Sequence, residues 1–278
     1  MRERLTITLK KDILDALDAQ IDGDRLRNRS HAIEYYLSKS LGQRALKVLI
    51  LAGGRPVDLG SSHGGKVPKA MVKIAGKPLL EHTLKRLKAE KFNDIVISVG
   101  EGGEAIADYF KDGQTLGIKI HYIQQKQGTR GTAQALMQAK DFLTGEFLLL
   151  YGDVLCEIDY GDLLEFHRRQ KSSVSTMALT SVDSPKMWGL AKLSGNKIIS
   201  YEEKPKSSKT FSHLVNAGVY VMEPEIFKYI VPTGVKLESD VFPRLAEEGR
   251  LSGYPFESLW LDVSNSAAYK QAVREIKS

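Results

Sequence analysis

The sequence is nearly free of cysteine. Cys156 is the single one among 278 residues, so a disulfide within one chain is excluded. Its apolar setting, residues 154–156, favours a packed thiol over a nucleophile. No apolar run approaches the ~20 residues that a membrane span needs, and the first residues hold no apolar signal segment. These absences predict a soluble, cytoplasmic protein that does not contact a membrane.

The sequence also lacks a clear metal-binding pattern and a strong charge bias. Its six histidines show no pairing at metal-ligand spacing, so we expect no structural zinc. The formal net charge is +6, but lysines alternate with Glu and Asp, as on a solvated surface. Charge alone therefore selects no anionic partner. The 42% hydrophobic content is enough for a real core.

The first 45 residues form a separate small unit in this interpretation. Residues 4–10 alternate between polar and apolar, the period of a strand that buries one face, with Ile7 on that face. Apolar residues at helical spacing predict one helix from about Asp12 and a second after Ser30, which can cap it. So small a unit cannot bury its own apolar faces. We therefore expect a homodimer or higher homo-oligomer with two strands paired antiparallel.

Strand, helix and helix in this order, with the helix start at residues 29–33, resemble a ribbon-helix-helix DNA-binding domain. The resemblance implies double-stranded DNA as a partner. The residues that it directs toward bases or phosphates are Arg4, Thr6, Thr8, Arg29 and Ser30. Because acidic residues nearly offset the basic ones in this unit, a ribbon that only dimerises stays open as an alternative.

Strand and helix patterns alternate through the first part of residues 46–278. Such alternation predicts a Rossmann-like α/β domain with a mostly parallel sheet, and ligands above the carboxyl ends of its strands. The expected strands are 47–51, 94–99, 119–124 and 146–151, and the expected helices are 78–90, 103–110 and 132–140.

The stretch from residue 47 onward reads as a buried strand and a glycine turn. The apolar run 48–51 fits a strand covered on both faces, and Gly53 and Gly54 follow it. Glycines there let backbone N–H groups approach a phosphate, although Gly-Gly is also an ordinary turn. Together with residues 68–69 and 76–80, this stretch resembles the opening signature of the sugar-phosphate nucleotidyltransferases.

Further matches follow in the order of that family. An Asp directly after an apolar strand, as at Asp153, suits Mg²⁺, although it also suits a simple turn. The resemblance implies that Asp153 and the Asp262 of a Trp-x-Asp motif hold one metal ion. It assigns the nucleotide to Leu51, Ala52, Gly53, Gly54, Gln125, Gly131 and Thr132, and the sugar phosphate to Gly189, Glu203, Lys204 and Asn216. Gly131 and Thr132 alone would also fit a helix cap.

One position departs from the family. The resemblance implies an arginine in the glycine loop that holds the triphosphate, and Asp58 lies in its place. A carboxylate there repels phosphate. We therefore expect Lys69, together with Arg55 or Lys66, to supply the catalytic cations.

Two functions follow from these observations. The first is a sugar-1-phosphate nucleotidyltransferase that uses Mg²⁺, a nucleoside triphosphate and a sugar 1-phosphate, and releases pyrophosphate. The alternative is a DNA-binding transcriptional regulator whose nucleotidyltransferase domain senses a nucleotide or nucleotide sugar. Retention of both Asp153 and Asp262 favours the enzyme, because a sensor has less use for two metal-binding carboxylates.

Overall fold

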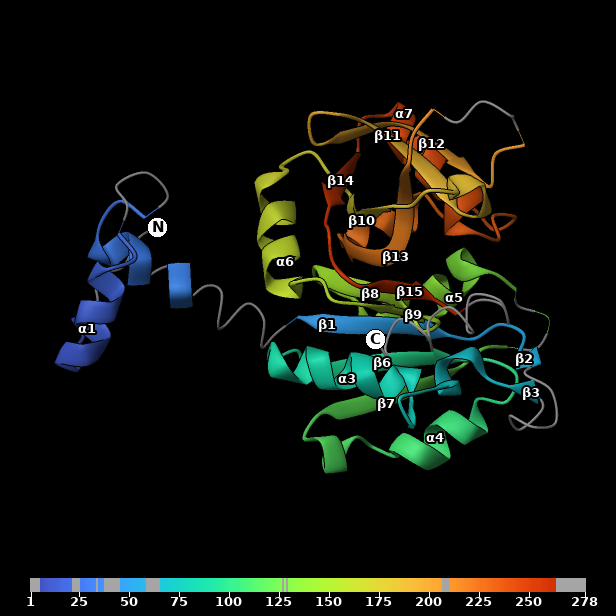
Figure 1. The fold of residues 1–278 in the computed structure, drawn as a ribbon, viewed down its shortest axis with the longest axis horizontal. Helices are drawn as coiled ribbons and strands as arrows, with labels where there is room; N and C mark the ends of the chain where they lie inside the picture. Colours follow the sequence, from blue (N-terminus) through green and yellow to red (C-terminus); the bar gives the residue numbers. More distant parts are fainter. Residues whose placement is uncertain are drawn as a thin grey trace. The chain divides into compact units, whose positions relative to one another are not determined.

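The computed structural model describes residues 6–21, 26–33, 35–37, 46–58, 66–126, 128, 130–206 and 211–263. The chain divides into two compact units, Met1–Ala45 and Leu46–Ser278, whose elements are drawn in Figure 1. None of the helices in these ranges is long and apolar enough to cross a membrane.

The described start of the N-terminal unit is a helix preceded by extended chain. Helix α1 spans Lys11–Asp18 and confirms the helix predicted from about Asp12. Residues 6–10 pair with no other described segment of the single chain, so the predicted strand, which needs a second copy, stays a prediction. A lone strand leaves backbone groups unpaired on both edges and needs a second strand. Ile7, expected on a buried face, is 44% exposed.

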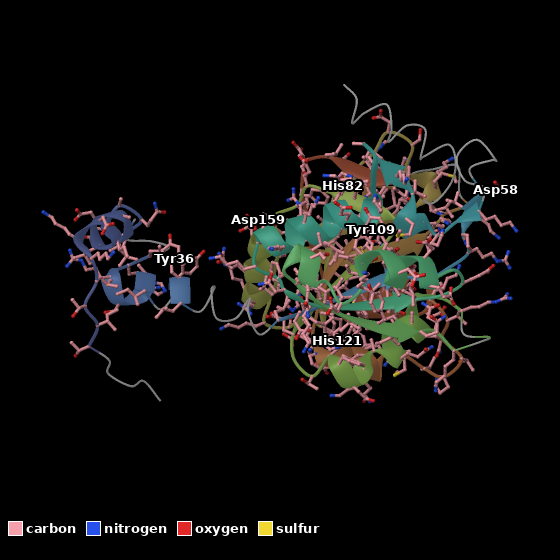
Figure 2. All side chains as sticks on the ribbon, turned by 90° about the horizontal axis from the view of Figure 1, so that it is seen from below. Tyr36, Asp58, His82, Tyr109, His121 and Asp159 are labelled. Carbon is pink, nitrogen blue, oxygen red and sulfur yellow. The ribbon has the colours of Figure 1, made fainter. Side chains whose placement is uncertain are left out.

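A second helix follows, with residues 29–33 and 35–37 helical. Ser30 lies inside this helix, so its prediction as the cap is wrong. The cap is Asn28, whose Oδ1 accepts the N–H of His31 at 2.9 Å. An Asn oxygen serves as well as a Ser hydroxyl at this position. Tyr36, labelled in Figure 2, is exposed on this helix.

Parallel strands form one half of the sheet in the larger unit. They are β1 (Lys47–Ala52), β6 (Asp94–Val99), β7 (Lys119–Gln124) and β8 (Phe147–Tyr151), in the order β7-β6-β1-β8. Each pairs in parallel with its neighbours. Their bounds agree with the predicted strands to within one residue.

The other half of the sheet corrects the expectation of a mostly parallel one. Its strands are β10 (Ser175–Ser181), β11 (Gly189–Ser194), β12 (Lys197–Glu203), β13 (Leu214–Met222) and β14 (Leu251–Pro255). Within the described residues, the nine strands of this sheet run β10-β14-β12-β11-β13-β8-β1-β6-β7. β11 and β12 are antiparallel because a tight turn joins them. β13 is antiparallel to β8 and connects the two halves.

Helices cover both faces of the sheet (Figure 1). On one face lie α3 (Leu79–Ala89), α4 (Glu104–Phe110) and α6 (Tyr160–Arg169), and on the other α5 (Thr132–Gln138) and α7 (Phe242–Glu247). β1 contributes Val48 and Ile50 to the first face and Leu49 to the second. All three are fully buried, which confirms a strand covered on both sides.

Three short two-stranded ribbons accompany the sheet, and the last of them brings segments together that are distant in the sequence. They are β2 (Val57–Asp58) with β3 (Lys66–Val67), β4 (Lys73–Ile74) with β5 (Lys77–Pro78), and β9 (Val154–Cys156) with β15 (Trp260–Asp262).

The short helices are η2 (Lys69–Met71), η3 (Gln114–Leu116), η4 (Lys140–Phe142), η5 (Pro185–Met187), η6 (Pro224–Lys228) and the π-helix η7 (Leu237–Val241).

Cys156 of β9 is packed in the core, as predicted. Its side chain is buried against the face that carries α3 and α6. Burial raises the pKa of the Cys156 thiol to about 11, so the thiolate is a minor species near neutral pH. The start of α6 is fixed beside it by Asp159, which accepts the N–H of Asp162 at 2.8 Å and is labelled in Figure 2.

Candidate active site

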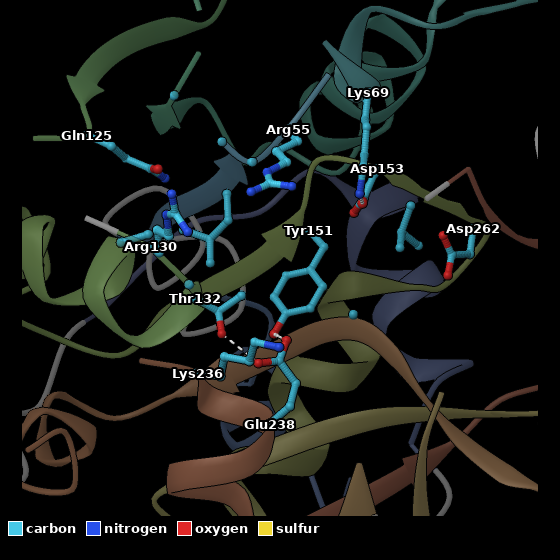
Figure 3. Close-up of a pocket in the computed structure, with 18 of the residues that line it drawn as sticks. Arg55, Lys69, Gln125, Arg130, Thr132, Tyr151, Asp153, Lys236, Glu238 and Asp262 are labelled. Carbon is cyan, nitrogen blue, oxygen red and sulfur yellow. Dashed lines mark hydrogen bonds and ion pairs between the residues drawn. The ribbon is translucent and has the colours of Figure 1, made fainter. Parts of the chain in front are cut away.

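A cavity of about 1060 Å³ opens at the carboxyl ends of the parallel strands. Residues that follow β1, β6, β7 and β8 line one part of it, and residues of β11, β12, β13 and the β9–β15 ribbon are among those that line the rest. Figure 3 shows its labelled side chains. In α/β sheets of this kind, this edge is where ligands bind.

The turn after β1 forms one wall of the cavity. A Cβ on Gly53 would collide with the amide of Gln125, so glycine lets Gln125 lie against the turn. Gln125 Nε2 donates to Ser98 Oγ at 3.2 Å. Of the residues assigned to the nucleotide in this region, Leu51, Gly53, Gly54 and Gln125 line the cavity, whereas Ala52 does not.

The start of α5 forms the next part of the wall, with Gly131 and Thr132 both lining it. The Thr132 hydroxyl does not cap its helix. It donates to Glu238 Oε2 at 2.6 Å and accepts the N–H of Leu237 at 2.9 Å. It therefore connects α5 to the π-helix η7.

Glu238 is a cavity residue that the sequence did not reveal. Its Oε1 accepts the hydroxyl of Tyr151 at 2.6 Å, in addition to the Thr132 contact. Burial and the charge of Glu238 raise the pKa of Tyr151 well above its ordinary value, so the phenol keeps its proton and donates. Glu238 lies far from these partners in the sequence, and no periodic signal links them.

The two aspartates of the predicted metal site are brought together. In the β9–β15 ribbon, Asp262 lies opposite Val154, and the N–H of Val263 donates to the Asp153 carbonyl at 2.9 Å. Burial and the charge of Asp262 raise the pKa of Asp153, while Lys69 acts in the opposite direction. Both carboxylates line the cavity (Figure 3).

The predicted cations separate into two groups. Lys69 and Arg55 line the cavity, but Lys66 does not, so the structure does not support Lys66 as a catalytic cation. Lys66 lies opposite Asp58 in the β2–β3 ribbon, which explains its different position. Arg130, which the sequence analysis missed, also lines the cavity and points into it on the side of Gln125 (Figure 3).

The residues assigned to the sugar phosphate lie on β11, β12 and β13 or directly after β12, and this part of the cavity is called its sugar-phosphate end. Gly189, Glu203, Lys204 and Asn216 all line it. A Cβ on Gly189 would collide with the Tyr201 hydroxyl and with Glu203. Burial and the charge of Glu238 raise the pKa of Glu203, which accepts the Tyr201 hydroxyl at 3.1 Å.

Asn216 is fixed within this end by three neighbours. Its Oδ1 accepts the N–H of Gly218 at 3.0 Å and the hydroxyl of Tyr220 at 2.7 Å. Its Nδ2 donates to the Tyr201 hydroxyl at 3.2 Å. The network holds the Asn216 amide rigidly at the cavity wall.

A different group of potential metal ligands lies at the amino end of β8. Glu146, His167 and Glu223 offer atoms within 4.8 Å of one another, a grouping that the spacing of the histidines could not indicate. Arg168 donates to Glu146 through Nε at 2.8 Å, and Thr176 Oγ1 lies 2.7 Å from Nδ1 of the histidine. These contacts account for the group without an ion.

The residues that the ribbon-helix-helix resemblance directs toward DNA belong to the N-terminal unit. Arg4 lies outside the described residues, and Thr6, Thr8 and Ser30 are exposed. Arg29 is already engaged, because its Nε donates to Asp18 Oδ1 at 2.7 Å and its terminal nitrogen to Oδ2 at 2.5 Å. A DNA phosphate would have to displace this carboxylate.

Comparison with known proteins identifies relatives for the larger unit. A sequence model of the family described as nucleotidyl transferase matches residues 47–278. A UTP–glucose-1-phosphate uridylyltransferase of Synechocystis sp. is 30% identical over 259 residues, covering 84% of this chain and 64% of that protein. The catalytic subunit beta of a mannose-1-phosphate guanylyltransferase of Danio rerio is 30% identical over 248 residues, covering 83% and 66%. The chain thus spans less than two thirds of these curated relatives.

A solved structure shares the fold. It is the crystal structure of a Bacillus anthracis protein described as a glucose-1-phosphate thymidylyltransferase in complex with sucrose. The TM-score is 0.73 at 26% identity, and the match covers 84% of this chain and 96% of that one. The α/β architecture of the larger unit is therefore that of these transferases.

Proposed function

The chain belongs to the nucleotidyl transferase family, and we propose that it joins a nucleoside triphosphate and a sugar 1-phosphate into a nucleotide sugar, with release of pyrophosphate. One observation carries the proposal. The paired carboxylates Asp153 and Asp262 lie in the same cavity as Glu203 and Lys204, between the glycine turn and the antiparallel half. A cavity with this content can hold both substrates.

The two ends of the cavity suit two different substrates. The glycine turn and the start of α5 offer backbone groups and the Gln125 amide to a nucleotide. The opposite end offers the Glu203 carboxylate to sugar hydroxyls and the Lys204 ammonium to the sugar phosphate. The substrates would then meet beside Asp153 and Lys69.

The reaction in this proposal is a single displacement. An oxygen of the sugar phosphate attacks the α-phosphorus of the triphosphate, the bond from that phosphorus to the bridging oxygen breaks, and pyrophosphate leaves with the bond electrons. The attacking oxygen is already ionised, so no general base is needed. The work of the protein is to bring anions together and to neutralise charge, with Lys69 and Arg55 on the triphosphate and Lys204 on the sugar phosphate.

Asp153 and Asp262 fit a divalent cation, which we propose is Mg²⁺. Each provides oxygen ligands, the preferred donors of this ion, and burial together with repulsion from Asp262 raises the pKa of Asp153. A nearby cation would relieve that repulsion. When bound, Mg²⁺ supplies charge neutralisation at the transferred phosphate.

Pyrophosphate release tests the proposal. The full chain is incubated with Mg²⁺ and each pair of a common nucleoside triphosphate with glucose, mannose or N-acetylglucosamine 1-phosphate. We expect turnover with at least one pair and its loss in Asp153→Asn and Asp262→Asn. Tyr109→Phe is the control. Tyr109 lies on α4 and donates to Glu81 on α3, and neither residue lines the cavity. A folded chain without turnover on any pair contradicts the proposal.

We also propose that two copies pair through their N-terminal units. α1 buries none of its residues, and Ile7, Ile13 and Leu37 are 44%, 50% and 50% exposed. Antiparallel pairing of residues 6–10 would satisfy their backbone groups and cover these side chains. Light scattering on the full chain should show a dimer that Ile7→Lys dissociates. A monomer at micromolar concentration contradicts the pairing.

DNA binding by this ribbon is the finer part of the same proposal. Thr6 and Thr8 are exposed in the single chain and would stay exposed on one face of the pair. Anisotropy of labelled duplexes at physiological salt tests it, with Thr6→Ala/Thr8→Ala as the variant. Binding that prefers certain sequences and is lost in the variant supports DNA recognition. Salt-sensitive binding indifferent to sequence contradicts it.

A further inference from the structure

The chain contains two tryptophans, Trp188 and Trp260, and both line the cavity. Their rings form an edge-to-face pair with centroids 5.4 Å apart and an interplanar angle of 71°. Such pairs hold both rings in defined orientations. The intrinsic tryptophan fluorescence of this protein therefore comes entirely from one place, beside the paired aspartates.

The two indole N–H groups have different acceptors. Trp188 Nε1 donates to Asp262 Oδ2 at 2.7 Å, whereas Trp260 Nε1 donates to the Ala217 carbonyl at 3.0 Å. A bond to a charged acceptor is short and strong, and an indole nitrogen can only donate. The Trp188 contact thus holds the Asp262 carboxylate in one rotamer.

The backbone of Trp188 is tied to the sugar-phosphate end. Its N–H donates to the Pro185 carbonyl at 3.1 Å, and its carbonyl accepts the N–H of Lys204 at 3.2 Å. The next residue, Gly189, pairs with Glu203 across the β11–β12 hairpin. One residue therefore contacts Asp262 through its side chain and Lys204 through its backbone.

We infer that Trp188 is a positioning residue. It orients Asp262 for a divalent cation and transmits occupancy of the sugar-phosphate end to that cation. The inference rests on the metal site of the proposed function. Partners that hydrogen-bond a metal-binding carboxylate fix its orientation, and their loss weakens metal affinity by about 10- to 100-fold. If the β11–β12 hairpin moved onto a sugar phosphate, the Trp188 indole would move with it and would shift the Asp262 carboxylate.

Direct Mn²⁺ binding tests the inference without turnover. Isothermal titration or electron paramagnetic resonance on the full chain gives the affinity for Mn²⁺, which stands in for Mg²⁺. Trp188→Phe, which keeps a ring but removes the N–H, should bind Mn²⁺ about 10- to 100-fold more weakly. Tyr109→Phe is the control and should stay within about threefold of the unaltered chain, because it also removes a ring-bound donor to a carboxylate, but its acceptor Glu81 lies outside the cavity lining.

Fluorescence and the response to glucose 1-phosphate are two measurements that should not change if Trp188 only packs against its neighbours. In Trp260→Phe, Trp188 is the single tryptophan, so all emission excited selectively from tryptophan comes from it. Mn²⁺ should change this emission as the charge on Asp262 is shared with the ion. Glucose 1-phosphate should strengthen Mn²⁺ binding to the unaltered chain and should fail to do so in Trp188→Phe. Circular dichroism and thermal unfolding confirm that the variants are folded.

Each outcome bears on the inference separately from the proposed function. Equal Mn²⁺ affinity of Trp188→Phe and the unaltered chain overturns it, and so does absence of Mn²⁺ binding to the unaltered chain. Weakened binding in Trp188→Phe supports it even if no substrate pair turns over, a result that would contradict the proposed transferase activity alone.

Discussion

Lys69 Nζ lies 3.1 Å from Oδ2 of Asp153, at the edge of the cavity where the parallel strands end. The lysine comes from η2 and the aspartate from the turn after β8, and Asp262 adds a second carboxylate beside them. The Lys69 charge opposes the rise in the pKa of Asp153. It thereby favours the ionised form of Asp153 but also repels an incoming cation.

Lys69→Met should separate turnover from metal affinity. We expect kcat/KM to fall by about 10- to 100-fold, since a charge-assisted contact to phosphate contributes about 1.5–3 kcal/mol. Affinity for Mn²⁺ in the absence of substrate should rise, because a positive charge has been removed beside Asp153. Steady-state kinetics and Mn²⁺ titration measure the two effects. Asp153→Asn should lower both quantities, and a parallel fall of both in Lys69→Met would contradict a phosphate-binding role.

The cations around the nucleotide end should differ in importance. Arg55 and Arg130 line the cavity, so Arg55→Ala and Arg130→Ala should each raise KM for the triphosphate by about 10-fold or more. Lys66→Ala should leave it within about twofold, because Lys66 belongs to the β2–β3 ribbon outside the lining. Initial rates at saturating sugar phosphate measure this. An effect of Lys66→Ala equal to that of Arg55→Ala would reinstate the sequence prediction.

The parallel half of the fold could be predicted because its pattern is local. A strand buried on both faces, such as β1, is an unbroken apolar run, and helices with one buried face alternate with such strands. The other half, which combines antiparallel pairs with the parallel pair of β10 and β14, lacks this regularity. Its order, in which β14 lies between β10 and β12, depends on contacts between segments far apart in the chain. The alternating pattern of residues 4–10 predicts pairing with a second copy, and that pairing stays a prediction.

The parts of the site that lie in short sequence motifs could be predicted from the sequence. Asp262 meets Asp153 through a ribbon of two three-residue strands, too short for any periodic signal, so only the family resemblance joined them. Glu238 could not be predicted from the sequence, because the π-helix in which it lies carries no recognisable motif. The hydrogen bond of the Trp188 indole could not be predicted either, because its acceptor, Asp262, is 74 residues away in the sequence.

Gly189→Ala should impair the sugar end selectively. The added methyl group would collide with the Tyr201 hydroxyl and with Glu203, displacing the carboxylate that we propose for the sugar hydroxyls. We expect KM for the sugar 1-phosphate to rise by about 10-fold or more, the loss of one or two hydrogen bonds, with triphosphate affinity unchanged. Gly145→Ala is the control, because nothing lies within 4 Å of its added Cβ. A rise in both KM values would show that the two ends are not separate.

Glu203→Gln should stabilise the protein in a pH-dependent way. Burial and the charge of Glu238 raise the pKa of Glu203 above its ordinary 4.5, so the folded chain holds this proton more tightly than the unfolded chain. The contribution of Glu203 to the free energy of unfolding therefore falls as the pH rises from about 4.5 through the raised pKa of the folded state. Gln resembles the protonated acid and does not titrate. The Tm difference between Glu203→Gln and the unaltered chain should be near zero at pH 4 and positive at pH 7.

Thermal unfolding between pH 4 and 8 measures this difference, and neighbouring, exposed Glu202→Gln is the matched control. The control should show a Tm difference that hardly changes with pH, because its carboxylate is solvated in both states. Glu203→Gln should meanwhile raise KM for the sugar 1-phosphate, since an amide is a weaker acceptor for a hydroxyl than a carboxylate. Stability and binding then oppose each other at one residue, as expected of a group placed for a ligand. A Glu203→Gln chain less stable than the unaltered protein at pH 7 would show that Glu203 serves the fold instead.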